Sequence, residues 1–221
     1  FQFPFTVAEN GNVDVVVMEC LIALEDFAKV LAAQGVKAAK QFVPQNKSVS
    51  RYAKAVLAGR AKNRKTVRPD SVDKATLSLL LSHAEPQHAS VGWLNPSYDN
   101  LPRKNPWLES AGKLYETGIY AHAPSTYHYV LNRAWQRLRG ECGLPSQQSG
   151  SVVFVIHSDA QEVFRSPVVR PGRTVSYDID LTGVNEIILS TEDAGDGQSR
   201  DWGMWLSPEL FRSAISSQAK K

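Results

Sequence analysis

The sequence predicts an α+β protein in which a helical N-terminal region, residues 1–89, precedes an all-β region, residues 90–221. Before residue 90, apolar residues recur at spacings of three and four, which is typical of helices. After residue 90, short alternating segments are separated by turn residues at intervals of about ten, as in a β-sandwich or barrel. All five Trp lie in the second region. We therefore predict two domains with different roles.

Three helices are expected in the N-terminal region. The first spans about residues 17–34 and the second about residues 48–57. The third begins after Pro69, with Asp70 or Ser71 as its N-cap. Its apolar residues would be Val72, Leu77, Leu79, Leu80 and Leu81.

A basic segment, residues 60–68, separates the second and third predicted helices. Five of its nine residues are Lys or Arg. It would suit either an anionic polymer or solvent, and we favour a solvated loop because no aromatic side chains are interleaved to stack on bases. With a net charge of only +3, the chain is not expected to bind nucleic acid. The helices themselves are a candidate surface for a protein partner.

No membrane span is predicted. The longest apolar candidate, Val13–Ala33, is interrupted by several charged residues. No signal peptide is recognisable in this sequence.

The second region has six well-marked strand predictions, two of which form a hairpin. They cover residues 126–131, 135–142, 151–157 with a hairpin partner at 161–165, 175–180 and 184–190. In the second of these, Cys142 shares a face with Leu138 and Gly140, and that face is expected to be the core. We therefore expect Cys142 to be a buried free thiol, with a disulfide to Cys20 as the alternative.

Several polar and aromatic motifs lie between these strands, where loops commonly carry binding groups. The first begins at Tyr115 and continues through Gly118-Ile119 to His122-Ala123-Pro124-Ser125. The next are Cys142-Gly143, the strand Val152–Ile156, its turn Ser158-Asp159, and Arg165-Ser166. The last are Asp193-Ala194-Gly195-Asp196-Gly197 and Asp201-Trp202-Gly203-Met204-Trp205.

In their order and spacing, these motifs resemble the NPCBM/NEW2 domain, the family 51 carbohydrate-binding modules, over about residues 90–212. The resemblance implies a jelly-roll β-sandwich of the galactose-binding-like kind. It also implies a non-catalytic role in binding sugars, plausibly terminal galactose-type glycans, in an extracellular or periplasmic setting. A signal peptide would then lie outside this sequence.

The last motif departs from the family pattern, which usually reads Asp-His-Ala-x-Trp. Trp202 stands where the family has His, and Met204 stands at a commonly acidic position. Ligand contacts made by those two positions in relatives are therefore in question here. This departure supports the alternative that the module is structural or binds protein and has lost its sugar site.

A sugar offers hydroxyl groups and one apolar face, so its site needs polar side chains and an aromatic platform. The loops supply both kinds. The predicted sugar-binding residues are Trp107, His122, Arg200, Asp201 and Trp202. The alternatives are that the two tryptophans fill the core or plug loops, and that His122 ties two loops together. Trp93, Trp135 and Trp205 are assigned to the core.

Asp193 and Asp196 are candidate Ca²⁺ ligands because they are carboxylates among glycines, close in sequence to Asp201. The spacing is not that of an EF-hand, and a solvated turn with Asx hydrogen bonds is the alternative. No other cofactor is expected. The sequence lacks the nucleophile elbow, zinc-protease, P-loop and dinucleotide motifs, so we expect no enzymatic activity.

Overall fold

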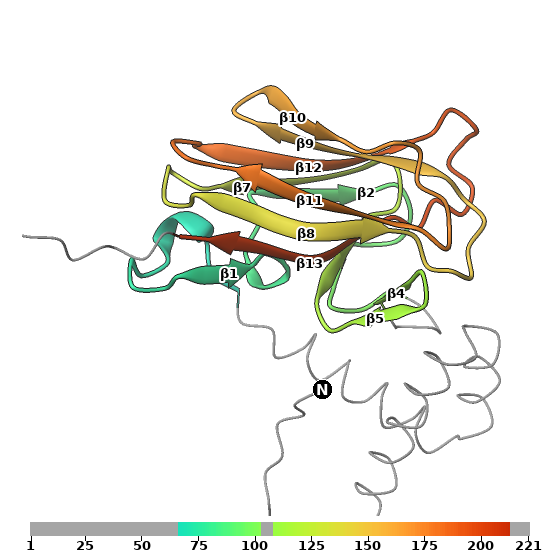
Figure 1. Ribbon diagram of the computed structural model, residues 1–221, viewed down its shortest axis with the longest axis horizontal. Coiled ribbons are helices and arrows are strands. Elements are labelled where there is room, and N and C mark those ends of the chain that lie inside the picture. Colours follow the sequence, from blue (N-terminus) through green and yellow to red (C-terminus); the bar gives the residue numbers. More distant parts are fainter. Residues whose placement is uncertain (1–65, 103–107, 213–221) are drawn as a thin grey trace, which may run out of the picture. The chain divides into compact units, whose positions relative to one another are not determined.

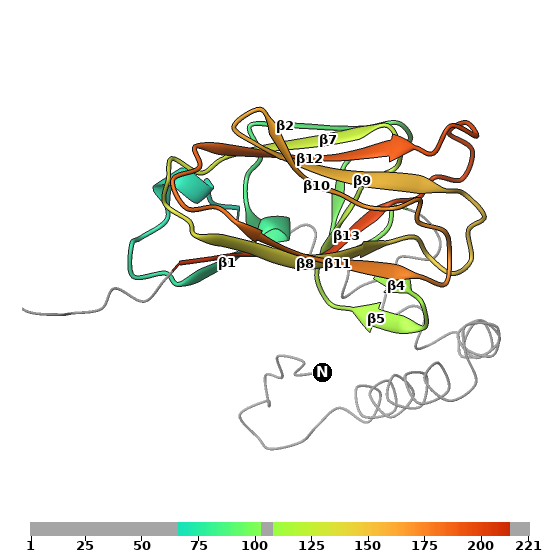
Figure 2. The same ribbon diagram turned by 45° about the horizontal axis from the view of Figure 1, so that its top comes forward.

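The protein is a sandwich of two antiparallel β-sheets (Figure 1). A computed structural model describes residues 66–102 and 108–212, which lie within one compact unit, Leu57–Lys221. Viewed along the layers, the two sheets face each other, and the small β4–β5 hairpin lies outside one of them (Figure 2).

One sheet has six strands in the order β11-β8-β13-β6-β3, and β1 also pairs with β13. Its strands are β1 (Ser78–Leu80), β3 (Ser97–Tyr98), β6 (Gly118–Tyr120), β8 (Arg137–Gly143), β11 (Thr174–Asp180) and β13 (Met204–Phe211). The other sheet has five strands in the order β10-β9-β12-β7-β2. These are β2 (His88–Val91), β7 (Ser125–Val130), β9 (Val152–Ser158), β10 (Gln161–Arg165) and β12 (Glu186–Asp193). The hairpin comprises β4 (Leu108–Ser110) and β5 (Lys113–Tyr115).

The core lies between the sheets, because alternate residues of each strand point inward. On β7, Tyr127 and Tyr129 are buried while their neighbours are partly exposed. On β8, Leu138 and Cys142 face the same core, as predicted. Cys142 is a buried free thiol whose Sγ donates a hydrogen bond to the Val175 carbonyl oxygen at 3.4 Å, and burial raises the pKa of that thiol. Cys20 lies outside the described residues.

The prediction of an α+β fold is wrong for the part of the chain that the structure describes, which contains no α-helix. The third predicted helix is replaced by a 3₁₀ turn, η1 (Pro69–Ser71), the strand β1 and a second 3₁₀ turn, η2 (Leu81–His83). The first two predicted helices, residues 17–34 and 48–57, lie outside the described residues. Within residues 66–102 and 108–212, no helix has the length and apolar character needed to cross a membrane.

Strand β1 forms because β6 pairs with only the first half of β13. β13 pairs with β6 through Met204–Leu206 and with β1 through Glu209–Phe211. Between these two stretches, the register of β13 relative to β8 shifts. Leu77, which the helical pattern placed on an apolar stripe, is exposed. Tertiary pairing with β13 therefore outweighs the helical propensity of the segment.

Arg212, just after β13, ties the segment before β2 to the sandwich. Its guanidinium donates hydrogen bonds to the carbonyl oxygens of Val72, Asp73 and Thr76, and to that of Ala134. It also lies over the Trp135 ring at 4.2 Å from the centroid. The Trp135 indole N–H donates to the Pro69 carbonyl oxygen at 3.0 Å. Trp135 is fully buried, as predicted.

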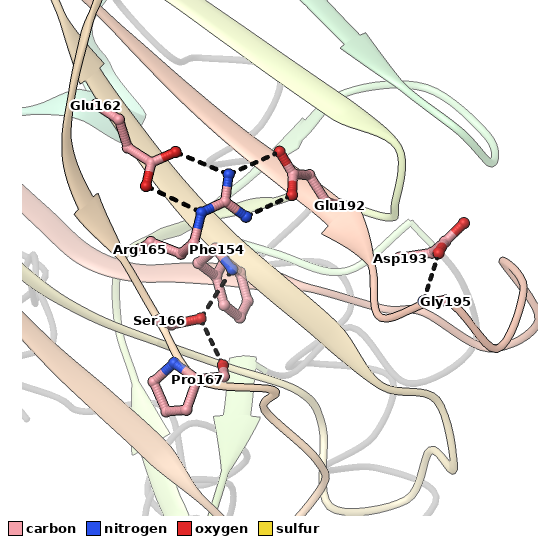
Figure 3. A network of polar contacts seen from close by, with 8 residues as sticks. All are labelled: Phe154, Glu162, Arg165, Ser166, Pro167, Glu192, Asp193 and Gly195. Carbon is pink, nitrogen blue, oxygen red and sulfur yellow. Dashed lines mark hydrogen bonds and ion pairs between the residues drawn. The ribbon is translucent and has the colours of Figure 1, made fainter.

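The Arg165-Ser166 motif has a structural role at the edge strand β10 (Figure 3). Arg165 donates paired hydrogen bonds to Glu162 on its own strand and further bonds to Glu192 on β12, which raises the pKa of its guanidinium. Ser166 accepts from the Phe154 N–H at 2.9 Å and donates to the Pro167 carbonyl oxygen at 2.8 Å. The motif therefore fastens the end of β10 to β9 and β12.

A second, smaller hydrophobic cluster lies outside the six-stranded sheet, under the β4–β5 hairpin. Its buried members are Leu101, Leu108, Tyr115, Tyr120, Met204 and Leu206. The hairpin is also held by Glu141 of β8, which accepts hydrogen bonds from the Tyr115 hydroxyl at 2.6 Å and the Lys113 ammonium at 2.7 Å. Trp202, one of the predicted sugar-binding residues, packs against this cluster.

Candidate functional site

Three loops meet at one end of the sandwich. They are the turn from β6 to β7, the segment before β13, and the loop after β2. Backbone hydrogen bonds join them: the Ala123 N–H donates to the Asp201 carbonyl oxygen at 3.1 Å, and the Gly92 N–H donates to that of His122 at 3.1 Å. The sequence motifs at His122 and Asp201 are thus brought into contact.

The loops carry a cluster of three rings, formed by Tyr120, His122 and Trp202. The ring centroid of Trp202 lies 5.1 Å from that of Tyr120 and 6.2 Å from that of His122, and the latter pair meets edge to face. Tyr120 and His122 are 6.3 Å apart. Trp202 is partly exposed, whereas Tyr120 is buried. The cluster therefore offers solvent one indole, supported from beneath by two other rings.

His122 is buried, with an exposed fraction of 6%. Its Nδ1 lies 2.8 Å from the Ala123 carbonyl oxygen, which can only accept, so Nδ1 carries the proton. Burial lowers the pKa of the imidazole. In the neutral ring, which burial favours, Nε2 is then the hydrogen-bond acceptor, and His122 contributes to loop structure through its own backbone and ring contacts.

Asp201 faces the interior, with an exposed fraction of 0%. Its Oδ1 accepts a hydrogen bond from the Ser151 N–H at 3.0 Å, while Oδ2 has no partner among the described residues. Burial raises the pKa of this carboxyl to about 6, and the nearby charges of Asp196 and Asp193 add to the effect. Gly150 permits the close approach, because a Cβ there would lie 2.4 Å from Oδ1.

Arg200 is exposed and adopts a positive φ of 66°. Its Nη1 donates to the Ser149 hydroxyl at 3.3 Å, which is the partner the structure gives its guanidinium. Arg200 thus lies on the same loop as Trp202 but is bonded towards the segment before β9. Trp107 lies outside the described residues.

The two candidate metal ligands, Asp193 and Asp196, accept hydrogen bonds from neighbouring groups of the protein. Asp193 accepts a hydrogen bond from the Gly195 N–H at 2.7 Å, which makes the Asx turn foreseen as the alternative. Asp196 accepts from the Ser151 hydroxyl at 2.6 Å and lies 4.0 Å from the Arg170 guanidinium. Across the described ranges, no group of three or more His, Cys, Asp or Glu side chains is arranged to hold a metal ion.

Trp93 was assigned to the core, and this assignment is wrong: 48% of the residue is exposed. It lies in the loop after β2, and its carbonyl oxygen accepts a hydrogen bond from the Tyr120 hydroxyl at 3.2 Å. It is therefore a further aromatic residue on the loops of the ring cluster. Its position between Gly92 and Asn95-Pro96 is a loop signal that could have identified it. Trp205, also assigned to the core, is fully buried.

Met204 and Gly203 explain the altered end of the last motif. The Met204 side chain is fully buried in the small cluster under the hairpin, where an acidic side chain would lose its hydration. At Gly203, a Cβ would come within 2.5 Å of the Ala121 carbonyl oxygen and 2.8 Å of Thr191. At Met204, one of the two positions that depart from the family pattern, the change thus concerns packing rather than an exposed side chain.

Comparison with solved structures finds the same sandwich. A family 51 module from Clostridium perfringens GH95, in complex with methyl-galactose, has a TM-score of 0.56 and 24% identity, covering 60% of this chain and 99% of that one. A structure from C. perfringens ZmpB, with the second family 51 module in complex with GlcNAc, has a TM-score of 0.56 and 19% identity, covering 61% and 31%. Tandem family 51 modules of a family 98 glycoside hydrolase from Streptococcus pneumoniae give 0.53 and 17%, covering 67% and 51%.

At these identities the structural likeness establishes the fold. The chain spans almost all of the first of these structures but about a third of the second. No curated protein matches the sequence. The family model of the NPCBM/NEW2 domain matches residues 78–211, well over half of the chain. The resemblance seen in the sequence motifs is thereby confirmed, and the chain belongs to the NPCBM/NEW2 domain family.

Proposed function

We propose that this domain binds carbohydrate without catalysing a reaction, through the loops that carry the Tyr120–His122–Trp202 ring cluster. The observation that supports the proposal most directly is the partly exposed indole of Trp202, fixed by two neighbouring rings. A rigid aromatic face is what the apolar face of a sugar ring requires. Polar groups near the indole are Nε2 of His122, whose ring centroid lies 6.2 Å from that of Trp202, and the exposed guanidinium of Arg200, two residues earlier in the chain.

The chemistry favours a neutral sugar. Solved neighbours of the same fold were obtained with methyl-galactose and with GlcNAc, both uncharged. The three acidic residues Asp193, Asp196 and Asp201 lie close enough for their charges to interact, and an anionic ligand would meet that negative potential. We therefore propose a neutral, galactose-type glycan, bound outside the cytoplasm.

Replacing Trp202 by Ala tests the proposal. A glycan array should first identify a ligand for the wild type, and calorimetry should then show that the variant binds it about 1–3 kcal/mol more weakly, the scale of a lost aromatic contact. Phe211→Ala is the matched control, because it removes an aromatic side chain at the opposite end of β13. Equal loss in both variants would point to a general loss of fold rather than to a binding platform.

A structural or protein-binding module is the second candidate function. It is favoured by the burial of His122 and Asp201, two of the five residues predicted to bind sugar. It would also follow from the packing role of Met204, where relatives commonly have an acidic residue. If a broad glycan array gives no ligand for the correctly folded wild type, this second function is the better one.

A further inference from the structure

The outward face of the five-stranded sheet carries three of the five histidines of the chain. The strand register places them in one transverse row. His88 on β2 pairs directly with His128 on β7, and His128 and His157 both pair with Ile188 on β12. Their neighbours along each strand, such as Tyr127 and Tyr129, face the core, so the histidines face outward.

His88 and His128 are close enough to share a ligand. Residues directly opposite each other on antiparallel strands have Cβ atoms about 4.5–5.5 Å apart. His88 is exposed, and its side chain has no hydrogen bond or ion pair with any residue that the structure describes. His128 is half-buried, with a side-chain exposure of 22%. Two imidazoles are therefore presented side by side, one free and one partly fixed.

Glu186 fixes the His128 ring. The Glu186 Oε2 lies 2.9 Å from the His128 Nε2, which donates the hydrogen bond because the carboxylate can only accept. In the neutral ring, the proton is then on Nε2, and Nδ1 keeps its lone pair. Metal-binding histidines characteristically donate their other ring N–H to a carboxylate in this way.

We propose that His88 and His128 form a two-imidazole site for a late first-row divalent metal ion, of the class of Zn²⁺, Ni²⁺ or Cu²⁺, with water in the remaining positions. Imidazole nitrogen suits these ions. Glu186 acts as a positioning residue that orients the His128 ring. With two protein ligands, the site agrees with the lack of any group of three or more such side chains among the described residues.

His157 is not part of this site. It is separated from His128 by β12, and two strand spacings amount to about 9–10 Å, too far for both to bind one ion. On its other side it pairs with Glu162 of β10. His157 is therefore a matched control: it has the same chemistry, lies on the same face and belongs to the same row.

The test is a Ni²⁺ titration of the full chain by calorimetry, with nuclear magnetic resonance to locate the ion by paramagnetic broadening. Signals of β2 and β7 should broaden first. His88→Ala and His128→Ala should each lower the affinity for Ni²⁺ by at least about tenfold, the lower end of the effect of losing even a supporting partner. Glu186→Gln should lower it by about tenfold, and His157→Ala should leave it unchanged.

Thermal melts of each variant check that the fold is kept, and His128→Gln provides a second, polar replacement if His128→Ala is destabilised. Equal Ni²⁺ affinity in the wild type and the double variant H88A/H128A would overturn the proposal. Broadening centred on any part of the chain other than β2 and β7 would overturn it as well. A loss of affinity in His157→Ala equal to that in His88→Ala would show only general surface binding by histidines.

Discussion

At the scale of single residues, the best-defined group in the loops around the ring cluster is Asp201. A carboxyl without solvent contact, with one oxygen unpartnered among the described residues, is costly when charged. Its raised pKa of about 6 means that the folded protein holds the proton more tightly than the unfolded chain, where an Asp has a pKa near 4. Its contribution to stability is therefore largest below about pH 4 and is lost as the pH rises to about 6.

Replacing Asp201 by Asn should remove this pH dependence, because an amide oxygen can still accept from the Ser151 N–H but carries no charge. As the pH rises from 4 to 7.5, the free energy of unfolding of the variant should increase relative to that of the wild type by about 1–2 kcal/mol. This range allows for some solvent screening near the loop surface. Urea unfolding of both proteins at several pH values measures the difference.

Asp180→Asn is the control for this experiment, because the pKa of Asp180 is lowered, chiefly by the hydrogen bond from the Thr182 hydroxyl. Its difference from the wild type should be negligible or change with pH in the opposite sense. A constant difference between Asp201→Asn and the wild type across the pH range would contradict the assignment of a raised pKa to Asp201.

At the scale of elements, the sequence predicts strands well where alternation is complete and poorly where pairing decides. The predicted hairpin strand at residues 161–165 coincides with β10, and the segments near β7, β8, β9, β11 and β12 were all identified. The local spacing of apolar residues predicts a helix at β1. This prediction is wrong because β1 pairs with the second half of β13, and the two segments are far apart in sequence. β13 itself was overlooked, since its first residues belong to a motif that was interpreted as a loop.

The anchor of the β1 segment is open to a direct test. Arg212→Ala removes hydrogen bonds to four carbonyl oxygens and the contact with the Trp135 ring. It should lower the free energy of unfolding by about 2–4 kcal/mol, as expected for charged hydrogen bonds together with a cation–π contact. Denaturant unfolding monitored by tryptophan fluorescence measures this.

Arg137→Ala is the comparison. Arg137 pairs with Asp178 on the outer face of the sheet, where both side chains are about half exposed. A solvent-exposed pair of this kind contributes little to stability, so this variant should unfold close to the wild type. If the two variants lose stability equally, Arg212 is not the anchor that its contacts indicate.

At the scale of the whole molecule, the motifs predicted the family and the sandwich because their order is itself a fingerprint of the fold. The loops of the ring cluster were predicted as segments, and His122, Asp201 and Trp202 do come together. What the sequence did not reveal is which side chains face outward there. Asp201 points inward because of loop packing, which no local pattern records, whereas the turn residues around Trp93 could have indicated its exposure.

The proposal that residues 90–221 form an independent domain bears on where the folding unit begins. Residues 66–89 contact the sandwich extensively: Leu81 and Ala84 are fully buried in its core, and β1 completes the pairing of β13.

A chain of residues 57–221 is therefore expected to fold alone with a β-type circular dichroism spectrum. A chain of residues 88–221 should be less stable than the longer one by at least about 2–5 kcal/mol, the cost of removing one large buried side chain such as Leu81. Thermal melts of the two chains decide this. Equal melting temperatures would mean that the sandwich closes without β1 and that the segment before β2 is an accessory to the fold.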